Sequence, residues 1–472
     1  MTTTELAYLD LTDAGRRVQA REMSSGELTR DLMQRIEALQ PRLKAYATVT
    51  VDLALAQAAQ ADADIARGVV RGPLHGVPVA VKDLCFTKGI PTAGGMAIYR
   101  DFRPKHDATV VTRLREAGAV LLGKLQLTEG AFGAHHPSID PPVNPWSAAH
   151  WTGVSSSGSG VATAAGLCFG SLGSDTGGSI RFPSTMNNVT GLKPTWGRVS
   201  RHGVFALAES LDHVGPMCRS AIDCAAMLGA LAGADADDPT AAPAPVPDYL
   251  AGIGQSVRGL RVGIDRKLNA AGADTDLVAA VEEGARVLAG LGAEIRDVAL
   301  PSPDDVVRDW RGLCAVEAAV VHEATFPARE AEYGPVLADL LRAGRSVGGL
   351  DLHKILLRRA GFTGALARLF ADIDLLLMPA MDHAAPTWEQ MRARGAQADP
   401  AAVRAATEAR LRFTSPFDMS GSPTLTLPGG RTKAGLPVGF QIVGRHMDEA
   451  TILRAGHAFQ QATDWHRRRP PI

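Results

Sequence analysis

The stretch from Trp151 to Pro183 reads WTGVSSSGSGVATAAGLCFGSLGSDTGGSIRFP and is the most informative part of the chain. Two loops rich in Ser and Gly flank one apolar segment, with Ser155 in the first loop and Ser179 in the second, 24 positions later. Residues this small let backbone amides and hydroxyl groups approach a single point that larger side chains would block. Core packing does not require such a composition, so the stretch predicts a reaction centre built from serines and main-chain amides.

Two buried strands are predicted upstream of this stretch. The run GVPVAVKDL, which begins at Gly76, is β-branched, is bounded by Pro and Gly, and ends as a strand near Lys82. An amphipathic helix over about 108–118 leads to a second run, AVLLGK, that ends at Lys124. A strand–helix–strand order implies parallel pairing through a crossover, which is typical of an α/β fold.

The rest of the chain continues this alternation. Further strands are expected at GLRVGID, AEIRDVAL, DIDLLLMP and LPVGFQIVG, and further helices over 220–232, 275–291 and 449–463. We therefore predict one large α/β domain with a central mixed, mostly parallel β-sheet that helices cover on both faces.

Composition shifts suggest how this domain is organised. Residues 1–70 have a helical pattern and form an N-terminal flank, and residues 71–472 form the α/β domain. A segment rich in Pro, Ala and Asp, at 234–256, is expected to be a surface excursion. A mainly helical insert at about 303–365 is expected near the substrate entrance.

Charge and cysteine content exclude several classes of function. With 49 basic and 50 acidic residues, the net charge of −1 creates no field that would attract nucleic acid or an anionic membrane. Five scattered cysteines, without CxxC or Cys/His spacing, favour neither disulfides nor a zinc site and suit a reducing cytosol. The N-terminus has no signal-peptide pattern, and no apolar run is long enough to span a bilayer. A cytoplasmic protein is expected.

Familiar cofactor motifs are absent from the sequence. There is no GxxxxGK[ST], no GxGxxG after a strand and no HExxH. One GxSxG string occurs at 344–348, but a helical pattern precedes it where a nucleophile elbow needs a buried strand. We interpret that string as a turn that ends a helix, and we predict no metal and no cofactor.

A reactive serine needs a base, and a lysine can serve when burial keeps it neutral. Lys82 is the first candidate because it ends an otherwise apolar strand, where a lysine is costly without polar partners or a function. A strand-end lysine that reaches solvent or pairs with Asp83 explains the same position. Lys124 ends the second strand in a similar way, and spacing alone does not choose between the two lysines.

The loop before the second serine has the properties of an oxyanion hole. The amides that can donate to an acyl oxygen there are those of Thr176, Gly177, Gly178 and Ser179. A tight Gly177-Gly178 turn that caps a helix accounts for the same residues. Asp175 and Arg181 flank the loop, and an ion pair between them would fix its shape.

Together these pieces resemble the amidase signature family. The central matches are GVPVAVKD around Lys82, the Ser155-Ser156 pair and GSDTGGSIRFP at 173–183. The likeness extends through NPW, GLKPTWGRVSRHGV, LDHVGPM and GLPVGFQIVG to the final ATDWHRRRPP. It thus covers nearly the whole chain.

The resemblance implies a Ser–cis-Ser–Lys triad. Ser179 would be the nucleophile that forms the acyl-enzyme, Ser155 the bridging serine, often on a cis peptide, and Lys82 the base. Ser156 would support the site, together with the flanking Asp175 and Arg181. This chain departs from the family's usual GGSSGGS, because Val154 and Ser157 replace glycines.

The implied activity is that of a stand-alone amidase, which releases a carboxylic acid and an amine or ammonia from a small aryl or alkyl amide. The alternative is the catalytic component of a tRNA-dependent glutamyl/aspartyl amidotransferase complex, which resembles this chain in the same core. The sequence KLQLTEGAFG after the second strand argues against that alternative, because such components have a KTNMDEF-like sequence there. A homodimer is compatible with either reading.

Four residues are expected to line the substrate pocket: Gln126, Phe132, Trp151 and Trp310. Their character would favour an aryl or alkyl acyl group, although apolar side chains more often serve only the core. Aryl, aliphatic and cyclic amides and carbamates all remain open as substrates.

Overall fold

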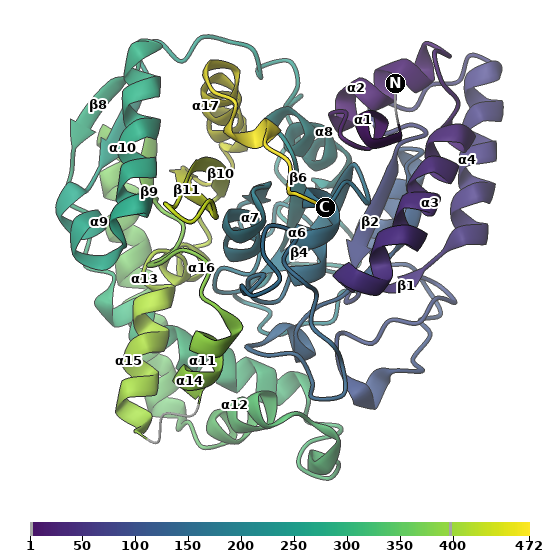
Figure 1. Ribbon diagram of the computed structural model, residues 1–472. Helices are drawn as coiled ribbons and strands as arrows, with labels where there is room; N and C mark the ends of the chain where they lie inside the picture. The colour runs from purple at the N-terminus through teal and green to yellow at the C-terminus, as the bar shows by residue number, and fades with distance from the viewer. Residues whose placement is uncertain (1–2, 396–398) are drawn as a thin grey trace.

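Eleven strands form one sheet in the computed structural model, which describes residues 3–395 and 399–472 (Figure 1). Their order across the sheet is β1-β3-β2-β4-β6-β5-β10-β11-β9-β7-β8. The strands are β1 Tyr46–Val49, β2 Pro78–Lys82, β3 Val120–Leu125, β4 Gly170–Asp175, β5 Thr190–Lys193, β6 His213–Cys218, β7 Arg261–Ile264, β8 Glu294–Asp297, β9 Leu375–Pro379, β10 Thr424–Arg431 and β11 Pro437–Gly444.

Helices fill most of the connections between these strands. The first nine are α1 Thr3–Ala7, α2 Leu11–Gln19, α3 Ser25–Leu43, α4 Val51–Ala66, α5 Thr109–Glu116, α6 Ser157–Ala164, α7 Arg181–Asn187, α8 Ala221–Leu231 and α9 Arg266–Gly272. The others are α10 Thr275–Gly290, α11 Asp304–Val321, α12 Pro335–Arg345, α13 Gly349–Asp372, α14 Trp388–Gly395, α15 Pro400–Leu411, α16 Ser415–Met419 and α17 Glu449–Ala462. None of these helices, in the residues described, is both long and apolar enough to cross a membrane.

The sheet is mixed, as predicted, but it is not mostly parallel. Of the ten strand pairs among the described residues, four are parallel and six are antiparallel. The strand–helix–strand units β2-α5-β3 and β7-α10-β8 are parallel, as their crossover helices require. The sequence interpretation missed β1, β4, β5, β6 and β10, and the pairings of β6 and β10 make the centre of the sheet antiparallel.

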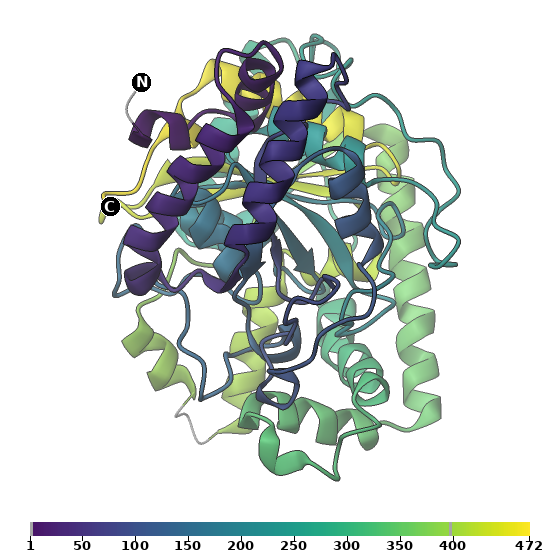
Figure 2. The same cartoon turned by 90° about the vertical axis from the view of Figure 1, so that its right-hand side faces the viewer.

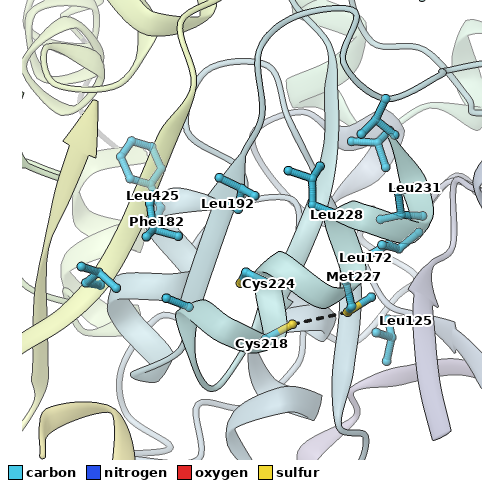
Figure 3. Packing of buried hydrophobic residues seen from close by; sticks show 14 of the residues in the cluster. Leu125, Leu172, Phe182, Leu192, Cys218, Cys224, Met227, Leu228, Leu231 and Leu425 are labelled. Atoms are coloured by element: carbon cyan, nitrogen blue, oxygen red, sulfur yellow. Dashed lines mark hydrogen bonds between the residues drawn. The ribbon is translucent and has the colours of Figure 1, made fainter. Parts of the chain in front are cut away.

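Helices cover both faces of the sheet, as predicted. Helices α8, α10 and α17 pack on one another and on one face, whereas α6 and α7 pack on the other. The two faces alternate along β11, where Phe440 contacts Gly284 of α10 and Gly439 approaches Thr185 of α7. Figure 3 shows the buried side chains that fill the layer between sheet and helices, including Phe182, Leu192 and Leu425.

Helices α11, α12, α14 and α15 gather below one end of the sheet, and the long helix α13 runs upward beside it (Figures 1 and 2). This end is where β2 and β4 finish, at Lys82 and Asp175. Trp310 of α11 reaches the loop after β4 and donates a hydrogen bond from Nε1 to the carbonyl of Thr176 at 2.7 Å. The helical segment therefore covers the ends of β2 and β4, where Lys82 and Asp175 lie.

The segment between α8 and β7 follows the molecular surface without a helix or a named strand. The buried Arg198 anchors it, because its guanidinium donates to Tyr249 Oη at 2.7 Å and to the carbonyl of Pro245 at 2.9 Å.

Candidate active site

Lys82, the last residue of β2, lies at the centre of a group of serine hydroxyls. Its Nζ donates hydrogen bonds to Ser155 Oγ at 2.6 Å, Ser174 Oγ at 2.9 Å and Ser156 Oγ at 3.0 Å. Lys82 is fully buried, and burial lowers the pKa of its ammonium group to about 7, although nearby acidic groups act in the opposite direction. At neutral pH a substantial fraction of Lys82 is therefore uncharged and able to accept a proton.

Lys124, the competing lysine, has a different environment. Its Nζ donates to Thr92 Oγ1 at 2.6 Å and lies 3.2 Å from Asp83 Oδ1. Asp83 thus pairs with Lys124 and not with Lys82. Of the two lysines, only Lys82 contacts the serines. Spacing in the sequence did not distinguish between them.

The two serine-rich loops lie side by side beyond Lys82. Ser156 is the N-cap residue of α6, and its backbone N–H donates to the carbonyl of Ser179 at 3.3 Å. The Ser156 hydroxyl donates to the carbonyl of Ser174 at 3.1 Å. Ser155 and Ser156 are fully buried, whereas Ser179 is 5% exposed. Of Ser155 and Ser156, Ser155 makes the shorter contact with Lys82.

The peptide bond before Ser155 is trans, which corrects the cis geometry that the resemblance implied. Among the described residues, the cis peptide bond is Phe326–Pro327. The Val154 side chain lines a cavity that Ser179 also lines.

The Asp175 carboxylate shapes the loop that carries Ser179. It accepts hydrogen bonds from the backbone N–H groups of Gly178 at 2.6 Å and Ile180 at 2.9 Å. Although burial opposes ionisation, the guanidinium of Arg181 holds the pKa of Asp175 well below its usual range. The carboxylate is therefore charged, and its hydrogen bonds to the backbone hold the loop between β4 and α7 in a turn.

This arrangement removes Gly178 from the set of predicted oxyanion donors, because its amide already donates to Asp175. The amides of Gly177 and Ser179 have no hydrogen-bond partner within the described part of the chain. Glycine is required at both positions before the serine: a Cβ on Gly177 would lie 2.5 Å from the Trp310 ring, and Gly178 has a φ of +129°.

Arg181 forms the buried end of this support. It contacts Asp175 at 2.8 Å and Asp418 at 2.6 Å, and it donates to the carbonyl of Thr414 at 2.9 Å. All three charged side chains are fully buried. Burial raises the pKa of Asp418 in spite of the adjacent guanidinium. The network connects the Ser179 loop to α16, more than 230 positions away.

We expect Arg181→Met to be strongly destabilising, because it removes the guanidinium that pairs with the buried carboxyl groups of Asp175 and Asp418. The expected loss is about 3–5 kcal/mol in the free energy of unfolding, measured by urea denaturation. Arg266→Met is the matched control, because its surface pairs with Glu282 and Asp297 contribute at most about 1 kcal/mol. Equal losses in the two variants would contradict this role of Arg181.

A cavity of about 390 Å³ opens beside Ser179, and we call it the first cavity. Its apolar lining includes Phe132, Trp151, Val154, Phe182, Leu207, Trp310, Val336, Val403 and Leu411. Charged groups also line it: the guanidinium-bearing Arg311 and Arg410, and Asp339. The structure thus places three of the four predicted pocket residues here. Gln126 is not among the lining residues, because it continues from β3, where its N–H donates to the carbonyl of Ala45.

Sequence reasoning missed three residues that shape the site. Ser174 contacts Lys82, Asp212 accepts a hydrogen bond from Thr176 Oγ1 at 2.6 Å, and Thr414 Oγ1 donates to the carbonyl of Gly177 at 2.7 Å. The motif GSDTGGS contains Ser174, so a search for further hydroxyls near the lysine would have found it. No local signal marks Thr414, which comes from a distant part of the chain.

Known proteins share this fold and this site region. A model of the amidase family matches residues 27–453. The chain is 50% identical to the putative amidase AmiD of Mycobacterium tuberculosis over 468 residues, covering 99% of this chain and 97% of the relative. It is 39% identical to a glutamyl-tRNA(Gln) amidotransferase component from Geobacter metallireducens, covering 99% and 100%. The solved peptide amidase of Stenotrophomonas maltophilia superimposes with a TM-score of 0.82 at 31% identity, covering 98% of each chain.

The family match and these relatives identify the chain as an amide-bond hydrolase. The chain belongs to the amidase signature family.

Proposed function

We propose that this protein hydrolyses a small aryl or alkyl amide through an acyl-enzyme on Ser179, with Ser155 as proton relay and Lys82 as base. The observation that carries the proposal is the buried 2.6 Å hydrogen bond from Lys82 Nζ to Ser155 Oγ, next to a cavity that exposes Ser179. In this arrangement Ser179 is accessible to the substrate, whereas Lys82 is shielded from solvent.

Acylation begins when Ser179 Oγ attacks the carbonyl carbon of the amide. The Ser179 proton passes to Ser155 Oγ as the Ser155 proton passes to the neutral amine of Lys82. The carbonyl oxygen becomes an oxyanion, and the amides of Gly177 and Ser179 are free to donate to it. The C–N bond then breaks, and the proton returns through Ser155 to the nitrogen, which leaves as a neutral amine or ammonia.

Deacylation repeats these transfers with water as the nucleophile. The water oxygen bonds to the acyl carbon while its proton passes through Ser155 to Lys82. Collapse of the second oxyanion breaks the ester bond to Ser179, and the serine oxygen recovers a proton from Lys82 by the same route. The carboxylic acid is released, and all three side chains regain their starting protonation states.

The lining of the first cavity supports an apolar acyl group. Trp310, Trp151 and Phe132 present ring surface beside Ser179, and Val154 narrows the space next to the relay serine. A panel of primary amides that differ only in the acyl part tests the assignment. Aryl and branched alkyl amides should have a higher kcat/KM than acetamide, and a panel with no hydrolysed member would contradict the proposed function.

We expect the kcat/KM of this reaction to rise with pH through about 7 and then level off, because Lys82 is cationic and unable to accept a proton below that pKa. Asp212→Asn should move the rise to lower pH, since the Asp212 carboxylate raises the pKa of Lys82. Glu129→Gln is the control: burial raises the pKa of Glu129 itself to about 7, but it does not contact Lys82. If the pH-dependent rise in kcat/KM disappeared only in Glu129→Gln, its assignment to Lys82 would be wrong.

The similarity to amidotransferase components supports a second candidate function, release of ammonia within a tRNA-dependent complex. Purification of the tagged chain from its own cells distinguishes the two. Stoichiometric recovery of two partner proteins, with glutamine as the preferred amide, would favour the complex. Recovery of the chain by itself, with turnover of other amides, would favour the stand-alone amidase.

A further inference from the structure

A second cavity, of about 320 Å³, adjoins the Lys82 cluster. Ser174 lines it, and the Ser174 hydroxyl is the one that accepts a hydrogen bond from Lys82 at 2.9 Å. Ser174 is 5% exposed, whereas Lys82, Ser155 and Ser156 are fully buried. The base therefore adjoins the second cavity through Ser174, while the nucleophile adjoins the first.

A thin wall separates the two cavities. Ala131 and Leu207 line both of them. Thr176, on the first side, donates its hydroxyl hydrogen bond to Asp212, on the second. A group released at the carbonyl carbon beside Ser179 is thus separated from the second cavity by about one side chain.

The two cavities have opposite charge. Four carboxylates line the second cavity, those of Glu209, Asp212, Asp237 and Asp238, against the single guanidinium of Arg201. That guanidinium lies over the Trp196 ring, donates to Thr240 and, against the effect of burial, acts to lower the pKa values of Asp212 and Asp238, but the four carboxylates still outnumber it. In the first cavity the balance is reversed, with the two guanidinium groups of Arg311 and Arg410 against the carboxylate of Asp339.

We propose that the second cavity binds and releases the amine product as ammonium or a small alkylammonium ion, while the carboxylate product leaves through the first cavity. The inference rests on the proposed function, because amide hydrolysis yields these two products. After release the carboxylic acid gives a proton to water and the neutral amine takes one up, so a carboxylate and a cation form from a neutral substrate. The carboxylates of the second cavity attract the cation, and the guanidinium groups of the first cavity attract the carboxylate product.

One bulky substitution in each cavity tests whether the two products leave by separate routes. Ala206 lines only the second cavity, and Val403 only the first. Ala206→Phe should lower steady-state turnover of a primary amide about tenfold through slow product release, with the rate of fluorophosphonate labelling at Ser179 unchanged. Val403→Phe should slow the labelling, because the probe enters through the first cavity. Ala206→Phe with unchanged turnover, or with turnover and labelling reduced in parallel, would overturn the proposal.

Methylammonium chloride, compared with sodium chloride at equal ionic strength, tests the charge argument. It should inhibit the wild type without competing against the amide, and the inhibition should weaken about tenfold in the Glu209→Gln/Asp237→Asn double variant. Equal inhibition of both proteins would contradict the proposal. If the wild type hydrolyses no amide, the proposed function fails, and calorimetric titration of both proteins with methylammonium still decides whether the cavity binds cations.

Discussion

Ser179→Ala will abolish amide turnover, with a loss of at least about 10⁴ in kcat, while the protein stays folded. The substitution removes the oxygen that forms the acyl bond, so no covalent route remains. The loop should keep its shape, because Asp175 holds it through the amides of Gly178 and Ile180 and not through the serine hydroxyl. Turnover and the unfolding midpoint, measured together, check both parts.

Ser184→Ala is the matched control for this variant. Ser184 lies on α7, close to the nucleophile in sequence, and its buried hydroxyl has no hydrogen-bond partner within the described residues. Its removal should leave activity within about threefold of the wild type, as expected for a residue outside the reaction path. If Ser179→Ala retained more than about one hundredth of the activity, the assignment of the nucleophile would be wrong.

Lys82→Met will lower kcat/KM by about 10³ or more, because the relay through Ser155 loses its proton acceptor. Methionine fills a similar volume, so a folded protein with slow chemistry is expected. Fluorophosphonate labelling of Ser179 should slow as well, since the probe needs an activated hydroxyl.

Lys124→Met separates this effect from the general cost of removing a buried lysine. That variant leaves Asp83 buried without its cation, so it should lose stability by about 3–5 kcal/mol. Its labelling rate per folded molecule should nevertheless stay close to that of the wild type, since Lys124 does not contact the serines. A labelling rate that falls further in Lys124→Met than in Lys82→Met would reassign the base.

The sequence predicted several of the apolar strands, but it missed β1, whose sequence is YATV. PVAVK and LLLMP were recognised and form β2 and β9. GSLGSD, which forms β4, was not recognised, because small residues have no intrinsic preference for strands. Its extended conformation depends on pairing with β2 and β6, which are distant in the sequence. The missed β6 and β10 explain why the sheet was expected to be mostly parallel.

The candidate site was predicted to the extent that its residues share short motifs. Both serines were proposed from the motifs, and the family resemblance selected Lys82 over Lys124 where spacing did not; in the structure Lys82 contacts Ser155 and Lys124 lies beside Asp83. The assignment of Gly178 as a donor failed because a sequence does not show which way an amide points. Gln126 was expected in the pocket but does not line the first cavity, and its backbone N–H and carbonyl pair with Ala45 and Gly158.

Mass spectrometry after fluorophosphonate treatment tests the central claim most directly. The account predicts one covalent adduct per chain, located on Ser179, with labelling that is lost in Ser179→Ala and slow in Lys82→Met. An adduct on any other residue of the wild type, or undiminished labelling of Ser179→Ala, would contradict an acyl-enzyme mechanism at this serine.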